Sequence, residues 1–540
     1  MFMTLLASEI TLASEVTIEG NLKSFLLVLA VSLSVATLPQ FLGWFRRIPY
    51  MLLLVIVGLG LAFVDVRLVN LSPELILSIF LPPLLFEAAW NLRWSELKQQ
   101  WIPISLYSIL GVLISIAGVT VGLNTFVSLS LPTALLIGAS LSATDPVSVI
   151  ALFRELGVDK RLSTIMEGES LFNDGMAVVA FSFLMGLPLG AANLGTADLT
   201  VPSMLLEFLR VVGVGVAVGC LIGFSISYLT QRFDLPLVEQ SLTLVSAYAT
   251  YLIAEDFGGS GVIAVVVTGL VLGNFGSLIG MNPRTRIVVT QFWEFLAFFV
   301  NSIVFLLIGD QIHFSHLAEN LGVIGVTIAS LIVSRAIAIA LLSRISNLQI
   351  SNLQISNIGA ESAITWQQQT VLWWGGLRGS VAIALALSLP VSLPARETLI
   401  ATVFGVVLFT LLVQGLTIQP LLAKLNLLGN QPLREVYSEC VARRVALNRV
   451  LEHLNQVEQQ PELDQEFYHY QMALIKGEIE QIQSQITQLQ EEYPQLQAFM
   501  NEQFREELLA IEARTYAELV RAGQLKEELA PLLQITPPES

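Results

Sequence analysis

The part of the sequence that decides the fold is EGESLFNDG, residues 167–175, which lies inside an apolar run over residues 163–187. A run of this length matches the roughly 20 residues that a helix needs to cross a bilayer. The acidic side chains of this stretch are therefore expected inside the membrane. An ionised group at the bilayer centre costs about 2.5 to 3.5 kcal/mol even on the lenient insertion scale, so each one requires a partner or a function.

The composition supports a membrane location for the whole region. Of the 540 residues 54% are hydrophobic and only 13% are charged, and the mean hydropathy is +0.71. These values fit no soluble class. About thirteen candidate membrane spans lie at residues 23–43, 49–66, 72–91, 101–124, 132–153, 163–187, 204–230, 237–255, 259–275, 288–309, 319–342, 369–390 and 398–422. The sequence thus predicts an all-α polytopic membrane protein.

Basic residues in the connecting segments predict the orientation. They concentrate in alternate loops, the cytoplasmic ones by the positive-inside rule, at Arg46, Arg47, Arg93, Lys98, Arg154, Lys160, Arg161, Arg232, Arg284, Arg286 and Arg344. We expect a short extracytoplasmic N-terminus (1–22), a transmembrane domain (23–425) and a helical cytoplasmic tail (426–540) in the inner (plasma) membrane. The tail holds 19 acidic and 9 basic side chains, and no part of the chain offers the basic stripe that nucleic acid requires.

Two predicted spans are interrupted. Helix 5 contains ATDP at residues 143–146, where proline removes a backbone donor, and helix 12 contains GGLRG at residues 375–379, where glycines weaken the helix. The two helices are seven spans apart, so they run in opposite directions. This pattern predicts two inverted six-helix repeats joined by helix 7, with broken helices 5 and 12 crossing near the midplane.

Five ionisable residues stand out inside the spans: Glu87, Asp145, Glu169, Asp174 and Arg378. Because Arg378 is the basic residue of a broken helix, we expect it to form a structural salt bridge with Glu169. Asp174 would then have no buried basic side chain as a partner, and a buried acid without such a partner is more often a functional residue than a structural one.

Helical spacing places a hydroxyl and a carboxylate on one face of helix 6. Ser170 and Asp174 are four residues apart, and Glu169 and Asn173 form the adjacent face. Hard cations such as Na⁺ are bound by oxygen atoms, and the break near Thr144 would add free carbonyl groups. Desolvation favours the protonated acid, so a proton and a cation would compete for Asp174. Such a site needs no cofactor, and its alternate opening to the two sides would give exchange.

Four motifs together resemble the cation:proton antiporter-1 family, the sodium/proton exchangers. They are FEAAWN at 86–91, TDPV at 144–147, ESLFNDG at 169–175 and GLRG at 376–379, within a match over about residues 23–425. The resemblance implies a homodimer whose core domain moves past a dimerisation domain, and Na⁺ (or Li⁺) exchange for H⁺ in pH and sodium homeostasis. It also implies electroneutral exchange, since Asn173 stands where electrogenic relatives have a second aspartate.

The resemblance also implies a role for each matching residue. Asp174 would bind the ion and the proton, and Thr144, Ser170 and Glu87 would complete the Na⁺ shell. Asp145 and Asn173 would hold the crossed helices, and Glu169 with Arg378 would form the stabilising pair.

Other functions fit the sequence less well. Exchange of K⁺ or Ca²⁺ for H⁺ stays open because ligand types alone do not set selectivity, and a cation channel is the alternative of another class. A redox-driven proton pump or a serine–histidine hydrolase is not supported, because the chain has no lysine between Lys160 and Lys424 and its four histidines lie at a helix end or in the tail.

Two features fall outside the family pattern. The segment after Arg344 repeats ISNLQ, at 345–349 and 350–354, and continues as ISN at 355–357, which predicts an expanded cytoplasmic loop without a function. The tail carries a heptad seam that predicts a coiled coil, formed by Met472, Ile475, Ile479, Ile482, Ile486, Leu489 and Tyr493. This seam could pair across a dimer or with a later helix near 500–525, and the tail could also bind a regulator.

Overall fold

The computed structural model describes residues 25–38, 48–63, 75–186, 201–232, 235–281, 283–312, 314–352, 363–390, 395–428, 431–457 and 465–492, with the single positions 23, 73, 393, 508 and 515. The chain divides into two compact units, Met1–Leu428 and Gly429–Ser540. The predicted N-terminal segment 1–22 lies outside the described residues.

The first unit is built from helices throughout its described part. In chain order they are Phe25–Leu38, α2 (Tyr50–Phe63), α3 (Leu81–Asn91), α4 (Trp94–Gln99), α5 (Trp101–Ser105), α6 (Gly111–Val127), α7 (Leu131–Ser140), α8 (Val147–Leu156), α9 (Lys160–Gly186), α10 (Val201–Thr230), α11 (Pro236–Asp256), α12 (Gly261–Val271), α13 (Pro283–Asp310), α14 (Phe314–Glu319), α15 (Leu321–Asn352), α16 (Trp366–Trp374), α17 (Ser380–Leu387), α18 (Arg396–Phe409) and α19 (Gly415–Lys424). Within the described residues, four π-helical stretches extend or join them: η2 (Leu75–Phe80), η3 (Leu106–Leu110), η4 (Leu272–Gly280) and η5 (Thr410–Gln414).

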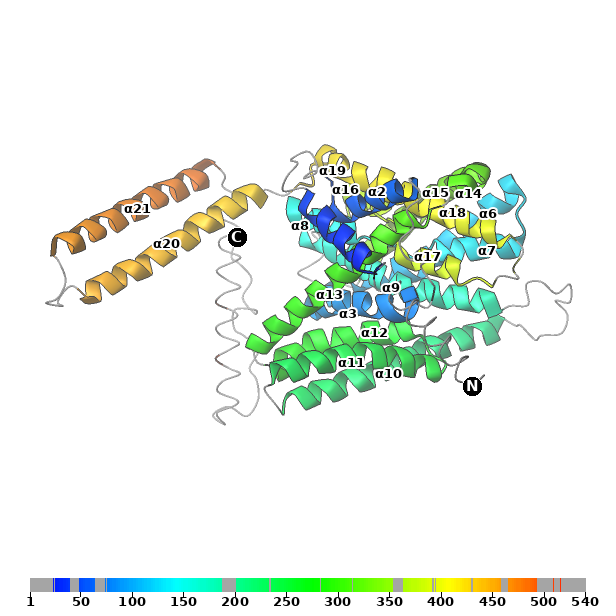
Figure 1. The fold of residues 1–540 in the computed structure, drawn as a ribbon, viewed down its shortest axis with the longest axis horizontal. Helices are drawn as coiled ribbons and strands as arrows, with labels where there is room; N and C mark the ends of the chain where they lie inside the picture. The colour runs from blue at the N-terminus through cyan, green and yellow to red at the C-terminus, as the bar shows by residue number, and fades with distance from the viewer. Residues whose placement is uncertain are drawn as a thin grey trace, which may run out of the picture. The chain divides into compact units, whose positions relative to one another are not determined.

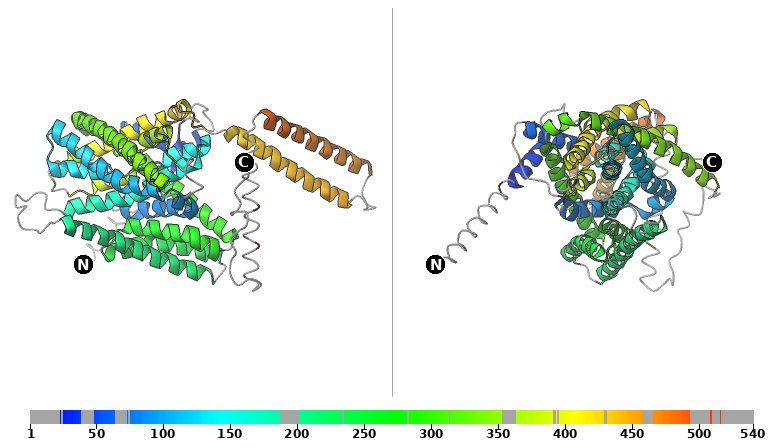
Figure 2. Two further views of the ribbon diagram at one scale, coloured as in Figure 1. Left: turned by 180° about the vertical axis from the view of Figure 1, so that it is seen from behind. Right: turned by 90° about the vertical axis from the view of Figure 1, so that its right-hand side faces the viewer.

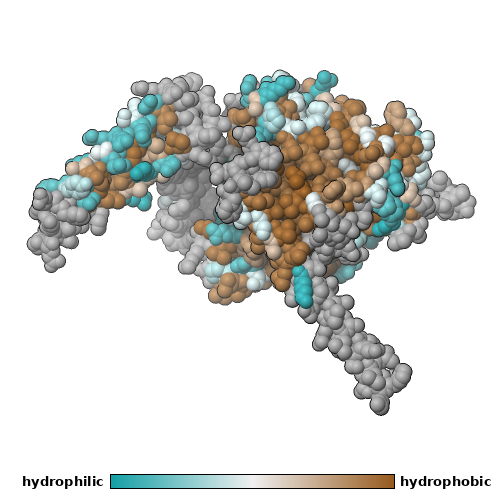
Figure 3. All heavy atoms as spheres, turned by 45° about the horizontal axis from the view of Figure 1, so that its top comes forward, coloured by the Kyte–Doolittle hydropathy of each residue, from teal (hydrophilic) through white to brown (hydrophobic). Residues whose placement is uncertain are grey.

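The helices are apolar enough for a membrane. Five described helices have the length and composition to cross one: Trp101–Val127, Leu206–Thr230, Thr285–Asp310, Leu321–Gln349 and Arg396–Lys424. Large hydrophobic side chains also lie on their outer surface, as Leu206 and Leu221 do on α10. In Figure 3 such side chains form a broad hydrophobic area. A soluble protein rarely exposes an apolar surface of this extent, whereas lipid covers it at no cost.

Helices distant in sequence pack closely around the middle of the unit. Helices α10, α11 and α12 contact one another and lie side by side, as Figures 1 and 2 show, and α12 also packs against α3. Helix α13 packs along α2, and α6 packs along α15. The α6–α15 contact depends on small residues, because a Cβ atom at Gly118 or Gly122 would collide with Ser334 or Ser330. Close approach through small residues is typical of helix pairs in membranes.

Each of the two interrupted helices consists of two short segments. Helices α7 and α8 are separated by residues 141–146, and α16 and α17 by residues 375–379. Pro146 directly precedes α8, and Gly379 directly precedes α17. The structure therefore has both interruptions at the positions where the sequence predicts them.

The first copy of the repeated pentapeptide is helical and not a loop, so this part of the sequence prediction is wrong. Helix α15 continues to Asn352, through residues 345–349 and into the second copy. Ser346 is fully buried, and the side chain of Asn347 bonds both backbone groups of Ile364, at 2.9 and 3.2 Å. Helix formation prevails because Ile345 and Ser346 pack inward. Residues 353–357 lie outside the described residues.

The second unit contains an antiparallel pair of helices, α20 (Gln431–Val457) and α21 (Gln465–Glu492). Hydrogen bonds join Tyr437 to Gln490 at 2.7 Å and Arg444 to Gln483 at 2.6 Å. A residue further along α20 therefore contacts a residue earlier on α21, so the two helices run in opposite directions.

The predicted heptad seam packs on this earlier helix of the same chain. Ile482 and Ile486 are buried with Tyr437, and Leu489 packs against them. Neither partner suggested from the sequence was α20, so that expectation is corrected; Tyr493 and nearly all of 500–525 lie outside the described residues. The sequence did not identify this partner because a seam by itself does not say which helix it packs on.

Candidate functional site

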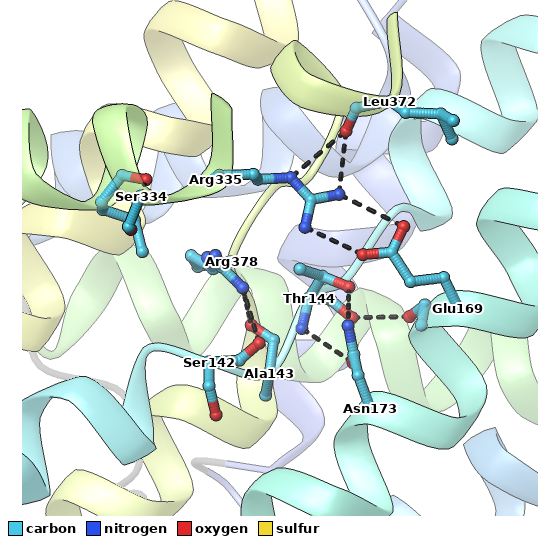
Figure 4. Close-up of polar contacts among 11 residues, drawn as sticks. Ser142, Ala143, Thr144, Glu169, Asn173, Ser334, Arg335, Leu372 and Arg378 are labelled. Carbon is cyan, nitrogen blue, oxygen red and sulfur yellow. Dashed lines mark hydrogen bonds and ion pairs between the residues drawn. The ribbon is translucent and has the colours of Figure 1, made fainter. Parts of the chain in front are cut away.

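The two interrupted helices meet at their breaks. The backbone amide of Asp145 donates to the carbonyl oxygen of Leu377 at 2.8 Å, which joins the first break directly to the second. Each break also frees backbone groups at helix ends, and such groups must find partners when they are buried. Side chains supply several of these partners, among them those of Arg378 and Asn173, as Figure 4 shows.

Arg378 binds carbonyl groups of the first break, just beyond the carboxyl end of α7. Its Nη1 atom donates to the carbonyl oxygens of Ser142 and Ala143, both at 2.8 Å, and its own backbone amide donates to Thr410 Oγ1 at 3.1 Å. The last carbonyls of a helix carry a partial negative charge, so a guanidinium group there is favourable. Two of the carbonyl groups that the first break frees therefore bind Arg378 and are not open ligands for a cation.

Asp145 satisfies the amino ends of two helices. Its Oδ1 atom accepts from the Val147 amide at 3.3 Å at the start of α8, and its carboxylate also accepts from the backbone of Ser380 at the start of α17. An acidic group at a helix amino end stabilises the partial positive charge there. Gly379 makes this contact possible, because a Cβ atom at this position would collide with the Asp145 carboxylate.

The partner of Glu169 is Arg335 of α15, and the predicted pair of Glu169 with Arg378 is wrong. Arg335 Nη1 lies 2.8 Å from Glu169 Oε1, and Nη2 lies 3.4 Å from Oε2. Nε and Nη2 also donate to Leu372 O, near the carboxyl end of α16. Arg378 Nη1 is bound to the carbonyl groups of the first break, and among the described residues no hydrogen bond joins Arg378 to Glu169.

Arg335 is the site residue that the sequence reasoning missed. It lies inside the predicted span 319–342, so the criterion that selected the other buried charges would also have selected it. Only 10% of its side chain is exposed, compared with 3% for Glu169. A Cβ atom at Gly376 would collide with the Arg335 guanidinium, so the glycines of the second break provide the space for this group.

Helix α9 is tied to the first break by Thr144. Asn173 Nδ2 donates to Thr144 Oγ1 at 2.6 Å, and the Thr144 amide donates back to Asn173 Oδ1 at 3.2 Å. Ser170 Oγ donates to the Thr144 carbonyl oxygen at 2.5 Å. The structure thus brings three of the predicted residues together with their oxygen atoms in one small volume.

Asp174 lies one helical turn beyond Ser170 on the same face of α9. Its side chain is buried, with 8% exposed, and its Oδ1 atom has no hydrogen-bond partner within the described part of the chain. The charged groups that act on it are Asp145 and Arg378. Asp145 is bound to helix ends and Glu169 to Arg335. Asp174 therefore has a carboxylate oxygen still open for a cation or a proton.

Glu87 occupies a different position from the other predicted ligands. It is half-buried on α3, and its Oε1 atom accepts from Asn91 Nδ2 at 2.6 Å. The charged groups that act on it are Arg154, Glu167 and Glu294. Among the described residues, no hydrogen bond joins Glu87 to Asp174 or to the Thr144 network.

Apolar helices around two interrupted helices that meet at their breaks, with buried ionisable groups at the crossing, define a multi-pass membrane transporter of the broken-helix class. The family described as "Sodium/hydrogen exchanger, transmembrane" matches residues 28–424. The chain belongs to this family.

Two known relatives are similar in sequence to nearly the whole chain. The chain is 60% identical to the Na(+)/H(+) antiporter ApNhaP of Aphanothece halophytica, over 96% of this chain and 97% of the relative. It is 56% identical to the low-affinity Na(+)/H(+) antiporter NhaS1 of Synechocystis, over 96% of each chain. The solved sodium proton antiporter MjNhaP1 of Methanocaldococcus jannaschii has the same fold, with a TM-score of 0.57, 21% identity, and coverage of 74% of this chain and 99% of that one.

Proposed function

We propose that the protein is a secondary antiporter that exchanges Na⁺ for H⁺. The two relatives at 60% and 56% identity are both named Na(+)/H(+) antiporters, which favours sodium over the potassium and calcium alternatives. The observation that carries the proposal within the chain is the buried Asp174, whose Oδ1 atom has no partner among the described residues.

Exchange follows from competition at this one carboxyl group. Without a cation, desolvation favours the protonated acid; a bound cation favours the ionised form and expels the proton. Thr144 and Ser170 would contribute neutral oxygen ligands to Na⁺, since their oxygens lie together beside the first break and Ser170 shares the helix face of Asp174. Glu87 would join the shell after a rearrangement of α3 or of its own side chain.

The surrounding charges would hold this site in place. Asp145 and Asn173 would keep the two breaks and α9 together, and Glu169 with Arg335 would tie α9 to α15. Arg378 would stabilise the carboxyl end of α7 and not pair with Glu169. One titratable proton for one monovalent cation makes the proposed exchange electroneutral, and no cofactor would take part.

The proposal extends to the architecture. The chain would cross the inner membrane about thirteen times as two inverted six-helix repeats, with the N-terminus outside and the tail from residue 426 in the cytoplasm. It would act as a homodimer with a mobile core domain, serve pH and sodium homeostasis, and carry its tail helices as a coiled coil. The basic residues in alternate loops support this orientation. The two interrupted helices, seven predicted spans apart, support the inverted repeats.

The decisive experiment measures cation-driven proton movement in proteoliposomes with a pH-sensitive dye. Asp174→Asn should fold and give no sodium-driven signal, because the amide cannot release a proton. Asp256→Asn, at an exposed acid that ends α11, is the matched control and should transport normally. Retained exchange in Asp174→Asn would remove this residue from the mechanism.

The same vesicles test the ion and the mode. Sodium should drive proton movement, and potassium or calcium should drive much less. Clamping the membrane potential at zero should leave the rate unchanged for one-for-one exchange. A rate that rises steeply with voltage would instead indicate an electrogenic antiporter or a cation channel.

A further inference from the structure

Three residues of α9 form a polar stripe that leads to Asp174. Glu167, Ser170 and Asp174 are spaced by three and four residues, so they lie on one face of the helix. At a rise of 1.5 Å per residue, Glu167 lies about 10 Å along the helix axis from Asp174. Glu167 is partly accessible, with 26% of its side chain exposed, whereas Asp174 is buried. The stripe therefore runs from an accessible carboxylate to the buried site.

Arg154 lies at the accessible end of this stripe. It is carried by α8, which begins directly after the first break, and it lies seven residues beyond Val147 at the start of that helix. Its Nη2 atom lies 3.1 Å from Glu167 Oε1, and 68% of its side chain is exposed. The proposed function uses neither Arg154 nor Glu167.

The charge of Arg154 also reaches Glu87 of α3. Arg154, Glu167 and Glu294 all act electrostatically on Glu87, and Arg154 is the basic member of this group. The negative charge of Glu96 also acts electrostatically on Glu167. The carboxylates of Glu167 and Glu87, on different helices, thus lie within electrostatic reach of one guanidinium group at the accessible end of the stripe, and these carboxylates are called the approach below.

We propose that Arg154 is a positioning residue that sets the apparent affinity for the transported cation by occupying the carboxylates of the approach. This inference rests on the proposed cation exchange. With no cation present, the guanidinium group binds Glu167 and lowers the negative potential at Glu87. An arriving cation must compete with this tethered positive charge, so Arg154 weakens binding without touching the ion at Asp174.

The test is a sodium titration of exchange in proteoliposomes. Arg154→Gln should lower the KM for sodium about two- to fivefold, the effect that an exposed ion pair supports, while the maximal rate changes little or falls. Arg154→Lys keeps the charge and should restore the KM. Glu167→Gln should shift the KM in the opposite direction, because it leaves the positive charge of Arg154 near Glu87 without its partner.

Arg210→Gln is the matched control. It breaks an ion pair of similar exposure, Arg210–Glu207 on α10 at 3.5 Å, away from the approach. Its KM should equal that of the unsubstituted protein.

The outcomes separate the two proposals. If the unsubstituted protein shows no sodium-driven proton movement, the proposed function fails. If it exchanges sodium and Arg154→Gln leaves the KM unchanged or raises it, only the role of Arg154 fails. Should Arg154→Gln not fold, Glu167→Gln tests the role of Arg154 by itself, and a raised KM for sodium would support that role. A KM for Glu167→Gln that is unchanged or lowered would overturn the inference.

Discussion

The Glu169–Arg335 pair gives the sharpest test of how the core is held together. Both side chains are buried, and removal of one partner leaves the other as an uncompensated charge. Breaking a buried pair in this way costs about 3–5 kcal/mol. Total stabilities of folded proteins are about 5–15 kcal/mol. Glu169→Gln or Arg335→Gln should therefore remove a large share of the free energy of unfolding.

A double-mutant cycle isolates the interaction itself. The double variant Glu169→Gln/Arg335→Gln leaves no unpaired charge, so its loss should be smaller than the sum of the single losses by about 1–3 kcal/mol. The comparison cycle joins Glu169→Gln with Arg378→Gln. Its coupling should be clearly smaller, because Arg378 Nη1 binds the Ser142 and Ala143 carbonyls.

The assay is unfolding of the purified protein in mixed detergent–SDS micelles, followed by tryptophan fluorescence. Exposed pairs provide the baseline, since they contribute about 0–1 kcal/mol. A coupling of Glu169 with Arg378 as large as that with Arg335 would refute the assignment of partners. Single losses below about 1 kcal/mol would refute the magnitude derived from burial.

The remaining predictions concern backbone space and the repeated segment. Gly376→Ala should destabilise the protein by about 1–3 kcal/mol, because its Cβ atom would displace the Arg335 guanidinium; an unchanged melting temperature would contradict this. Asn347→Ala should lower the melting temperature, since it removes two hydrogen bonds to Ile364. Asn352→Ala, the same position in the next repeat, is the control, and an equal loss in both variants would show that the bonds of Asn347 add nothing specific.

Much of the helical architecture could be predicted from local sequence. Apolar runs of about 20 residues have few alternatives to a membrane helix, because backbone groups in lipid must bond within their own segment. The two breaks were predictable for the same local reason, since proline and clustered glycines disfavour helix wherever they occur. The face shared by Ser170 and Asp174 follows from helical periodicity alone.

Pairings between helices were predicted less well. The partner of Glu169 was expected on the second broken helix and lies on α15, and the partner of the tail seam was expected elsewhere and is α20. In both cases the sequence contained the required residue. It could not rank the candidates, because the choice depends on which groups the packed helices bring within hydrogen-bonding distance.

The sequence by itself determined that the chain is a bundle of membrane helices, that two of them are interrupted, and that α9 carries an acid with a hydroxyl on its face. These properties depend on hydrophobicity and on the covalent restrictions of proline and glycine, which act over a few residues. Only the tertiary structure decided that Arg378 binds backbone carbonyls, that Arg335 binds Glu169, and that Asp174 keeps an oxygen without a partner. The reason is that a buried charge takes its partner from whatever group packing brings within about 3 Å, and sequence distance does not limit that choice.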